Sequence, residues 1–329
     1  MKQNSAVFAN FICRFGDKVL LDYAEQIVLP AFTDDTLIRS YGETQYHFYE
    51  VKLVNLAKRG EEPILAVVGQ FIKNTLLTRV QVFDESDGLI HDEQSMRSAP
   101  SAFFVLILNN HRLIYMPETP YAPDLVAFRG TVLAFLRSKW NKLIDSLFEA
   151  SKRNKEPITK VALRKLHPIP TLEVVPLTDR RSLAEFVKRY ETLRRIDFRL
   201  ITPNDEIDAS DTLERVRKLG LGLDATITKV ITENKDGLDK EASLTAVEEA
   251  TATGNQEVIL RGVDEAGNSL KVANDSFELS VPIVEIPNGI LAKAKFLFEK
   301  YIEQVDQQEI NAPGMNNAIE KIRQLVGLF

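Results

Sequence analysis

The chain has 329 residues, a formal net charge of −6 and a hydrophobic fraction of 44%, which is ordinary for a folded globular protein and argues against intrinsic disorder. Its only cysteine, Cys13, excludes an internal disulfide framework, fits a reducing cytoplasm, and lies in a predicted core strand, which favours a buried, unreactive thiol. No apolar run approaches the roughly 20 residues that a membrane span needs. We therefore expect no direct membrane insertion, and any membrane role would require a partner.

The charge is distributed unevenly along the chain. Residues 1–127 carry a net charge of −5 and residues 200–329 carry −10, whereas residues 128–199 hold 17 lysines and arginines and carry +9. A local patch sets the field that a ligand meets at contact, because distant charges are screened beyond about 10 Å at ordinary salt. The basic middle third is therefore the main electrostatic feature of the sequence.

The first 118 residues predict mainly β-structure. Residues 20–28 have helical apolar spacing, and this helix should stop before Pro30. Residues 101–118 predict a hairpin that turns at Asn109 and Asn110, which tolerate positive φ. Apolar and β-branched runs predict four earlier strands, over residues 6–15, 46–56, 64–72 and 77–83.

The period of the apolar residues changes after this hairpin. Residues 123–148 have helical spacing and predict a long helix. Residues 151–170 are basic and interrupted by prolines, which predicts a linker or an exposed basic arm. A short strand follows at 172–177. A capping box of Ser182 and Glu185 then predicts the start of a helix that runs to residue 193.

The segment from 195 to 285 predicts a small module with the order β-α-β-α-β-β. Asp211 and Glu214 should cap its first helix, Gly220 should end that helix, Gly267 should turn the final hairpin, and a strand over 277–286 should close the set. Two amphipathic C-terminal helices need a larger apolar partner than this module. We therefore predict an α+β fold. Its units are a globular α/β domain, residues 1–194 plus 286–329 with the C-terminal helices, and an inserted module, residues 195–285.

The sequence shows no recognisable catalytic or metal-binding pattern. The four histidines lack metal-ligand spacing, and no glycine-rich phosphate loop or nucleophile elbow occurs. The acidic stretch 84–93 fits an exposed turn better than a cation site, and residues 204–211 lack the glycine and glutamate of a calcium loop. We expect no catalytic residue, metal or cofactor, although carboxylates that assemble in space into a nuclease site remain an alternative.

The basic middle third has two interpretations. A solvated helix face explains the helix at 182–193, where Glu185 can pair with Lys188 or Arg189 at little gain in free energy. The other cations have few acidic neighbours in the sequence and fit a surface that neutralises phosphates with little sequence preference. The candidate DNA-binding residues are Lys152, Arg153, Lys155, Lys160, Arg164, Lys165, Arg180, Arg181, Lys188, Arg189, Arg194 and Arg195, with Arg180, Arg181, Arg194 and Arg195 in particular expected to contact phosphates.

Several short segments occur in the order and spacing of one known family. They are SAPSAFFV (98–105), LEVVPL (172–177), RIDFRLITPN (195–204), VILRGVDEAGNSL (258–270) and LSVPI (279–283). In this order the chain resembles RexA, the phage-exclusion family of lambdoid prophages, over roughly residues 98–310. The resemblance is clearest at the DEAG hairpin. The long helix at 123–150 departs from the family, because it is more extended here.

The resemblance implies a cytoplasmic DNA-binding homodimer in which the module at 195–285 is a mobile swivel. It further implies a non-enzymatic sensor in antiphage defence that binds double-stranded DNA and triggers a membrane-protein partner, which leads to abortive infection. The alternatives are a metal-dependent nuclease of a defence system and a scaffold whose basic face binds an acidic protein. Cleavage of DNA with a divalent metal would distinguish the nuclease, and failure to bind a plain duplex would favour the scaffold.

Overall fold

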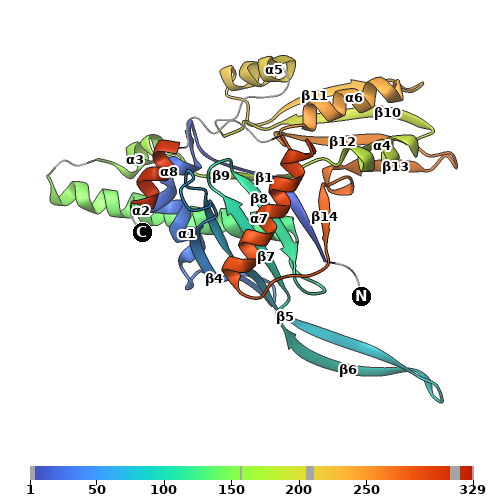
Figure 1. The fold of residues 1–329 in the computed structure, drawn as a ribbon, viewed down its shortest axis with the longest axis horizontal. Helices are drawn as coiled ribbons and strands as arrows, with labels where there is room; N and C mark the ends of the chain where they lie inside the picture. Colours follow the sequence, from blue (N-terminus) through green and yellow to red (C-terminus); the bar gives the residue numbers. More distant parts are fainter. Residues whose placement is uncertain (1–3, 156–157, 205–210, 312–318, 328–329) are drawn as a thin grey trace.

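The computed structural model describes residues 4–155, 158–204, 211–311 and 319–327, and contains two antiparallel sheets with associated helices (Figure 1). This architecture confirms the predicted α+β class. In the described part of the chain, no helix is both long enough and apolar enough to cross a membrane.

The larger sheet, called here the large sheet, has the strand order β14-β1-β8-β7-β5-β4-β3, with β2 and β9 pairing with β1, and β6 pairing with β5. Its bounds are β1 (Asn4–Phe15), β2 (Lys18–Val19), β3 (Arg39–Tyr41), β4 (Thr44–Asn55), β5 (Leu65–Asp84), β6 (Gly88–Ser98), β7 (Ser101–Ile107), β8 (Arg112–Pro117), β9 (Thr171–Pro176) and β14 (Ser280–Ile283).

Both faces of the large sheet are covered. In β7, Ala102, Phe104 and Leu106 point into one core, whereas Phe103 and Val105 point into a second core on the opposite face. Because neither face meets water, the strand is continuously apolar and does not alternate with polar residues. The first core is covered by α1 (Leu29–Thr33), α2 (Leu125–Arg153) and α3 (Lys160–Leu166) with α8 (Ile319–Val326), and the second is covered by α7 (Ile290–Asp306).

The second sheet, called here the small sheet, has the strand order β11-β10-β12-β13. One face carries its own core, in which Leu183 of α4 and Val247 of α6 pack with Leu260 of β12. The chain order of these elements confirms the predicted β-α-β-α-β-β pattern. The bounds are α4 (Arg180–Lys188), β10 (Thr192–Leu200), α5 (Asp211–Gly222), β11 (Thr228–Glu233), α6 (Lys240–Thr251), β12 (Gln256–Val263) and β13 (Ser269–Ala273).

Two elements lie on the other side of the predicted boundaries. α4 falls before the boundary at 194, yet its Leu183 and Val187 are buried in the small-sheet core. β14 falls inside the segment 195–285, yet it pairs with β1, with Ala6 opposite Val281. The helix and strand patterns are local, whereas the partner that covers each apolar face comes from distant sequence. The division into two independent units stays a prediction.

The seam between the two sheets is mainly polar. Asn10 on β1 donates from Nδ2 to Oδ1 of Asn255 at 2.9 Å. The amide of Asn204 brackets β1, since its Nδ2 donates to the carbonyl of Phe11 at 3.1 Å and its Oδ1 accepts from the backbone N–H of Cys13 at 3.1 Å. These contacts join β1 of the large sheet to the segments that flank β10 and β12.

The structure corrects several local expectations about where elements begin and end. Residues 20–28 form a 3₁₀ turn and a π turn, and Pro30 lies near the start of α1 instead of beyond the end of a helix. α4 begins at Arg180 with Asp179 as its N-cap, not at Ser182. The residue with positive φ in the β7–β8 turn is His111, not Asn109 or Asn110.

In α5, the predicted C-terminus at Gly220 is also wrong, since the helix runs on through Gly222. A Cβ on Gly220 would lie 2.0 Å from Oγ1 of Thr228. This glycine therefore allows α5 to approach β11 closely, which is a packing role and not a capping role.

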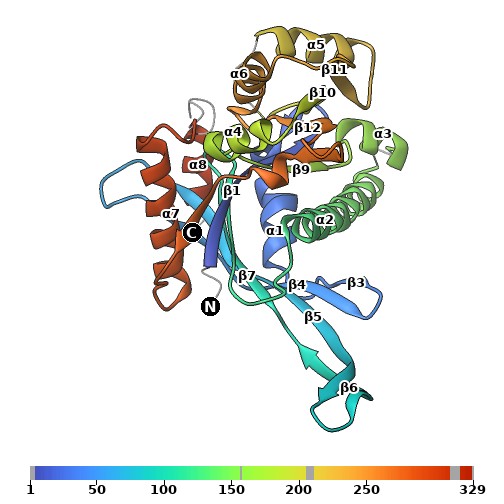
Figure 2. The same ribbon diagram turned by 90° about the vertical axis from the view of Figure 1, so that its right-hand side faces the viewer.

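Strands predicted at 64–72 and 77–83 are one continuous strand, β5, of 20 residues. Its outer half pairs with β6, an element that the sequence did not predict, and the two form a hairpin that projects from the body of the molecule (Figures 1 and 2). Asp84 closes the tip, because its carboxylate accepts hydrogen bonds from the backbone N–H groups of Ser86 and Asp87. The first part of the acidic stretch is thus an exposed turn, as expected, whereas residues 88–93 belong to β6 and were not expected to form a strand.

Candidate nucleic-acid interface

The structure divides the twelve predicted basic residues into two clusters. The α2–α3 cluster consists of Lys152, Arg153, Lys155, Lys160, Arg164 and Lys165, and the α4–β10 cluster consists of Arg180, Arg181, Lys188, Arg189, Arg194 and Arg195. α3 and α4 lie well apart in both views of the molecule (Figures 1 and 2). The sequence therefore predicted one continuous basic surface where the fold provides two.

Helix packing brings the α2–α3 cluster together. The segment predicted to be a linker or an arm contains α3, whose Leu163 is buried in the first core of the large sheet beside Trp140 and Ile144 of α2. The indole Nε1 of Trp140 donates to the carbonyl of His167 at 2.8 Å, which ties the end of α3 to α2. Thr159 caps the start of α3 by accepting from the backbone N–H of Ala162.

The α2–α3 cluster has few carboxylates to offset its charge. Between residues 145 and 166, six cations stand against two carboxylates among the described residues: Lys152 pairs with Glu149 at 3.0 Å, and Lys160 pairs with Asp145 at 2.5 Å. The remaining four cations, Arg153, Lys155, Arg164 and Lys165, are exposed and form no ion pair within the described chain. Cations near the C-terminus of a helix also stabilise that helix through its dipole, so part of this pattern has a purely structural explanation.

The α4–β10 cluster lies among more carboxylates. Arg195 donates from Nε to Asp197 at 2.6 Å and lies 3.4 Å from Glu233 on β11, which is its cross-strand partner. Arg181 is 3.8 Å from Glu309. The register of β10 against β12 shifts between Leu193 and Arg195, so Arg194 lies where the regular alternation of side chains is interrupted. The phosphate contacts expected of Arg194 and Arg195 stay a prediction. The sequence also allows Arg194 and Arg195 to pair with Asp205 or Asp208 instead of a phosphate, but both aspartates lie outside the described residues.

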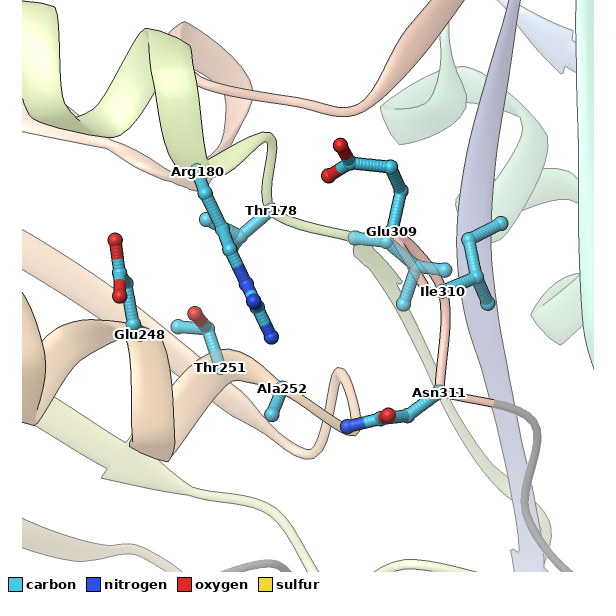
Figure 3. A pocket seen from close by; sticks show the side chains of 9 residues that line it. Thr178, Arg180, Glu248, Thr251, Ala252, Glu309, Ile310 and Asn311 are labelled. Carbon is cyan, nitrogen blue, oxygen red and sulfur yellow. The ribbon is translucent and has the colours of Figure 1, made fainter. Parts of the chain in front are cut away.

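Arg180 lines a small pocket between α4, the end of α6 and the segment after α7. Figure 3 shows its side chain running from the start of α4 toward Thr251 and Asn311, with Glu248 and Glu309 on the two sides. The pocket has a volume of about 20 Å³, which is room for one ordered water and not for a ligand. Arg180 is thus exposed while its side chain also borders the junction between these elements.

The described residues contain no group of three or more His, Cys, Asp or Glu side chains arranged to hold a metal ion. Cys13 is buried in β1, and burial raises the pKa of its thiol to about 12, as expected for an unreactive cysteine. The structure also contains a cleft between the two sheets. The sequence did not indicate this cleft, because its walls come from segments that lie far apart in the chain.

Comparison with known proteins adds no relatives: no protein-family model matches this chain, and no curated protein matches it in sequence. The resemblance to the RexA family therefore stays a hypothesis that depends on the five short segments alone.

Proposed function

We propose that this protein binds double-stranded DNA, with little sequence preference, through the α2–α3 cluster. The observation that carries the proposal is a group of four exposed cations at the end of α2 and on α3, none of which has an ion-pair partner in the described chain. Lysine and arginine side chains that neutralise phosphates release counterions, which drives binding without reading the bases.

The pairing of charges favours this cluster over the α4–β10 cluster. A phosphate that approaches Arg195 has to compete with Asp197 and Glu233, and one that approaches Arg181 meets Glu309. Lys165 and Arg164 have no such competitors within the described residues. Arg180, Lys188, Arg189 and Arg194 are also exposed without an ion pair in the described chain, so the α4–β10 cluster is a second candidate surface.

The cellular role that we propose depends on the resemblance to the RexA family and not on the geometry of the structure. We propose a non-enzymatic sensor in antiphage defence that acts as a homodimer, because two copies would place two α2–α3 clusters on one duplex and increase affinity. A membrane-protein partner belongs to the same proposal. Light scattering at micromolar concentration should give twice the mass of the chain, and a monomer mass would contradict the homodimer.

The DNA surface is tested by two matched double variants measured by fluorescence anisotropy across a range of KCl concentrations. Arg164→Ala with Lys165→Ala should flatten the slope of log K against log salt by roughly 2, because each lost phosphate contact removes about 0.9. The control, Lys188→Ala with Arg189→Ala, removes two exposed cations at the end of α4 and should leave the slope unchanged.

Unrelated duplexes of equal length should be weakened equally by the first variant. A reversed result, in which only the α4 variant flattens the slope, would move the interface to the other cluster and overturn the proposal. Absence of binding at low salt would reject DNA binding altogether. Magnesium-dependent cleavage of the same duplexes by pure protein would favour the nuclease instead.

A further inference from the structure

A cleft of about 520 Å³ separates the large sheet from the small sheet. Its walls come from β1, β8 and β9 of the large sheet, from the start of α2, from β10 and β12 of the small sheet, and from the segment that follows β13. The volume lies in the range of pockets that hold small molecules, which run from about 300 to 1,000 Å³. The cleft is therefore large enough for a ligand.

Much of the wall is apolar. Leu125 and Val126 of α2 and Val174 of β9 contribute solvent-accessible apolar side chains, and Ile259 contributes from β12. A hydrocarbon chain that lies against these side chains would be removed from water, which is worth about 25 cal/mol for each Å² of apolar surface buried. The wall thus favours a ligand with an aliphatic portion.

Both guanidinium groups in the cleft are already neutralised. Arg129 lies 2.7 Å from Glu173, and Arg199 lies 2.7 Å from the other oxygen of Glu173 and 2.8 Å from Glu257. This network links α2 and β9 to the small sheet and closes one side of the cleft. It leaves neither arginine free to attract an anion.

Three carboxylates in the same lining have no ion-pair partner among the described residues. Asp124 caps α2 by accepting from the backbone N–H of Ala127 at 2.7 Å, while Asp275 is exposed. Glu278 is half-buried, and burial together with the nearby Asp275 raises the pKa of its carboxyl. The cleft therefore has an excess of negative charge that a cation would offset.

The spacing of these carboxylates argues against a metal ion, because no group of three acidic or histidine side chains in the described part of the chain is close enough to hold one. An extended cation can instead reach separated carboxylates while its chain covers the apolar wall between them. We propose that this cleft binds an aliphatic amine that carries two or more ammonium groups along a hydrocarbon chain.

In this arrangement one ammonium group donates hydrogen bonds to Glu278 and Asp275, and a second lies toward Asp124. Lysine side chains combine an aliphatic stem and a charged end in the same way when they lie along apolar surfaces. The inference is independent of the DNA surface, because no residue of the α2–α3 cluster lines the cleft.

The test is isothermal titration calorimetry of the full chain with 1,5-diaminopentane and with spermidine. Two further probes distinguish the effect of the positive charge from that of the hydrocarbon chain. The first, 1,5-pentanediol, has the hydrocarbon chain without the charge, and the second, MgCl₂ at equal ionic strength, has the charge without the hydrocarbon chain. We expect saturable binding of the amines that is at least about tenfold tighter than that of either probe, the scale of one charge-assisted hydrogen bond.

Glu278→Gln should weaken binding of the diamine by about tenfold, and Asp275→Asn should weaken it in the same direction. Glu285→Gln is the matched control, because Glu285 is an exposed carboxylate on the next segment that does not line the cleft. Binding of Mg²⁺ as tight as that of the diamine, or an unchanged affinity in both Glu278→Gln and Asp275→Asn, would overturn the proposal.

Discussion

The large sheet and the small sheet differ in what covers their second faces. In the large sheet, the face that carries Phe103 and Val105 is buried against α7. In the small sheet, the face opposite its core carries ion pairs instead, since Asp197 lies between Arg195 and Arg261. The sequences record this difference, because β7 is apolar throughout whereas β12 alternates between buried and more exposed positions. The spacing of apolar residues along each strand therefore indicates whether one or both faces of that strand are buried.

The largest expected effect comes from breaking the first core of the large sheet. Phe128 is fully buried, and its ring lies 5.3 to 5.9 Å from the rings of Phe48, Phe71, Phe104 and Tyr115. Phe128→Ala should lower the free energy of unfolding by roughly 3–5 kcal/mol, because it removes apolar contacts and leaves a cavity. Urea unfolding followed by the fluorescence of Trp140, the only tryptophan, reports on this core.

The matched change in the small sheet is Leu260→Ala, which should cost roughly 2–5 kcal/mol. If the two sheets unfold independently, this variant shifts the circular-dichroism transition while the transition of Trp140 stays in place. Coincident shifts of both probes in both variants would show that the polar seam couples the sheets into one cooperative unit.

Acid should weaken the large sheet selectively through His111. Burial lowers the pKa of its imidazole from 6.5 to about 4, and its Nε2 has no hydrogen-bond partner among the described residues. The unfolded chain therefore binds more protons than the folded chain between these values. The stability that the neutral imidazole contributes is therefore fully present above pH 6.5. As the pH falls from 6.5 toward 4, the free energy of unfolding decreases by about 3 kcal/mol.

His111→Asn isolates this effect, because asparagine tolerates the positive φ of 56° at this position. The variant should lose overall stability through the cavity but should show a flatter dependence of stability on pH between 6.5 and 4.5. His47 and His167, whose pKa values are also lowered by burial, add to the slope, whereas the raised pKa of Glu278 opposes it. A slope as steep as in the unchanged chain would contradict the assignment to His111.

The smallest effect is expected in the projecting hairpin. Phe83 and Leu89 face each other across β5 and β6 and are 72% and 65% exposed. Replacing both with threonine, a β-branched residue that also favours strands, should change the free energy of unfolding by no more than about 0.5 kcal/mol. The same replacement at Phe71, on the buried inner half of the same strand, provides the contrast and should cost several-fold more. The free energy of unfolding is measured by urea unfolding, and a loss in the hairpin variant as large as that in the Phe71 variant would contradict this prediction.

The sequence alone predicted features that depend on local pattern. The hairpin at 101–118, the order of elements in the small sheet and the two C-terminal helices all follow from the period of apolar residues and from turn chemistry within a few residues. The division of charge along the chain is also purely a matter of sequence. These features need no knowledge of which segments meet.

Only the tertiary structure decided which distant segments share a core or an ion pair. α4 joins the small sheet and β14 joins the large sheet because their apolar faces are covered by residues far along the chain. Arg195 is paired and Arg164 is not because strand register places Glu233 opposite Arg195, while α3 packs where no carboxylate is free within the described residues. The spacing of apolar residues along the sequence indicates whether a side chain is buried. It does not indicate which distant segment packs against that side chain, because this depends on which long loops close during folding.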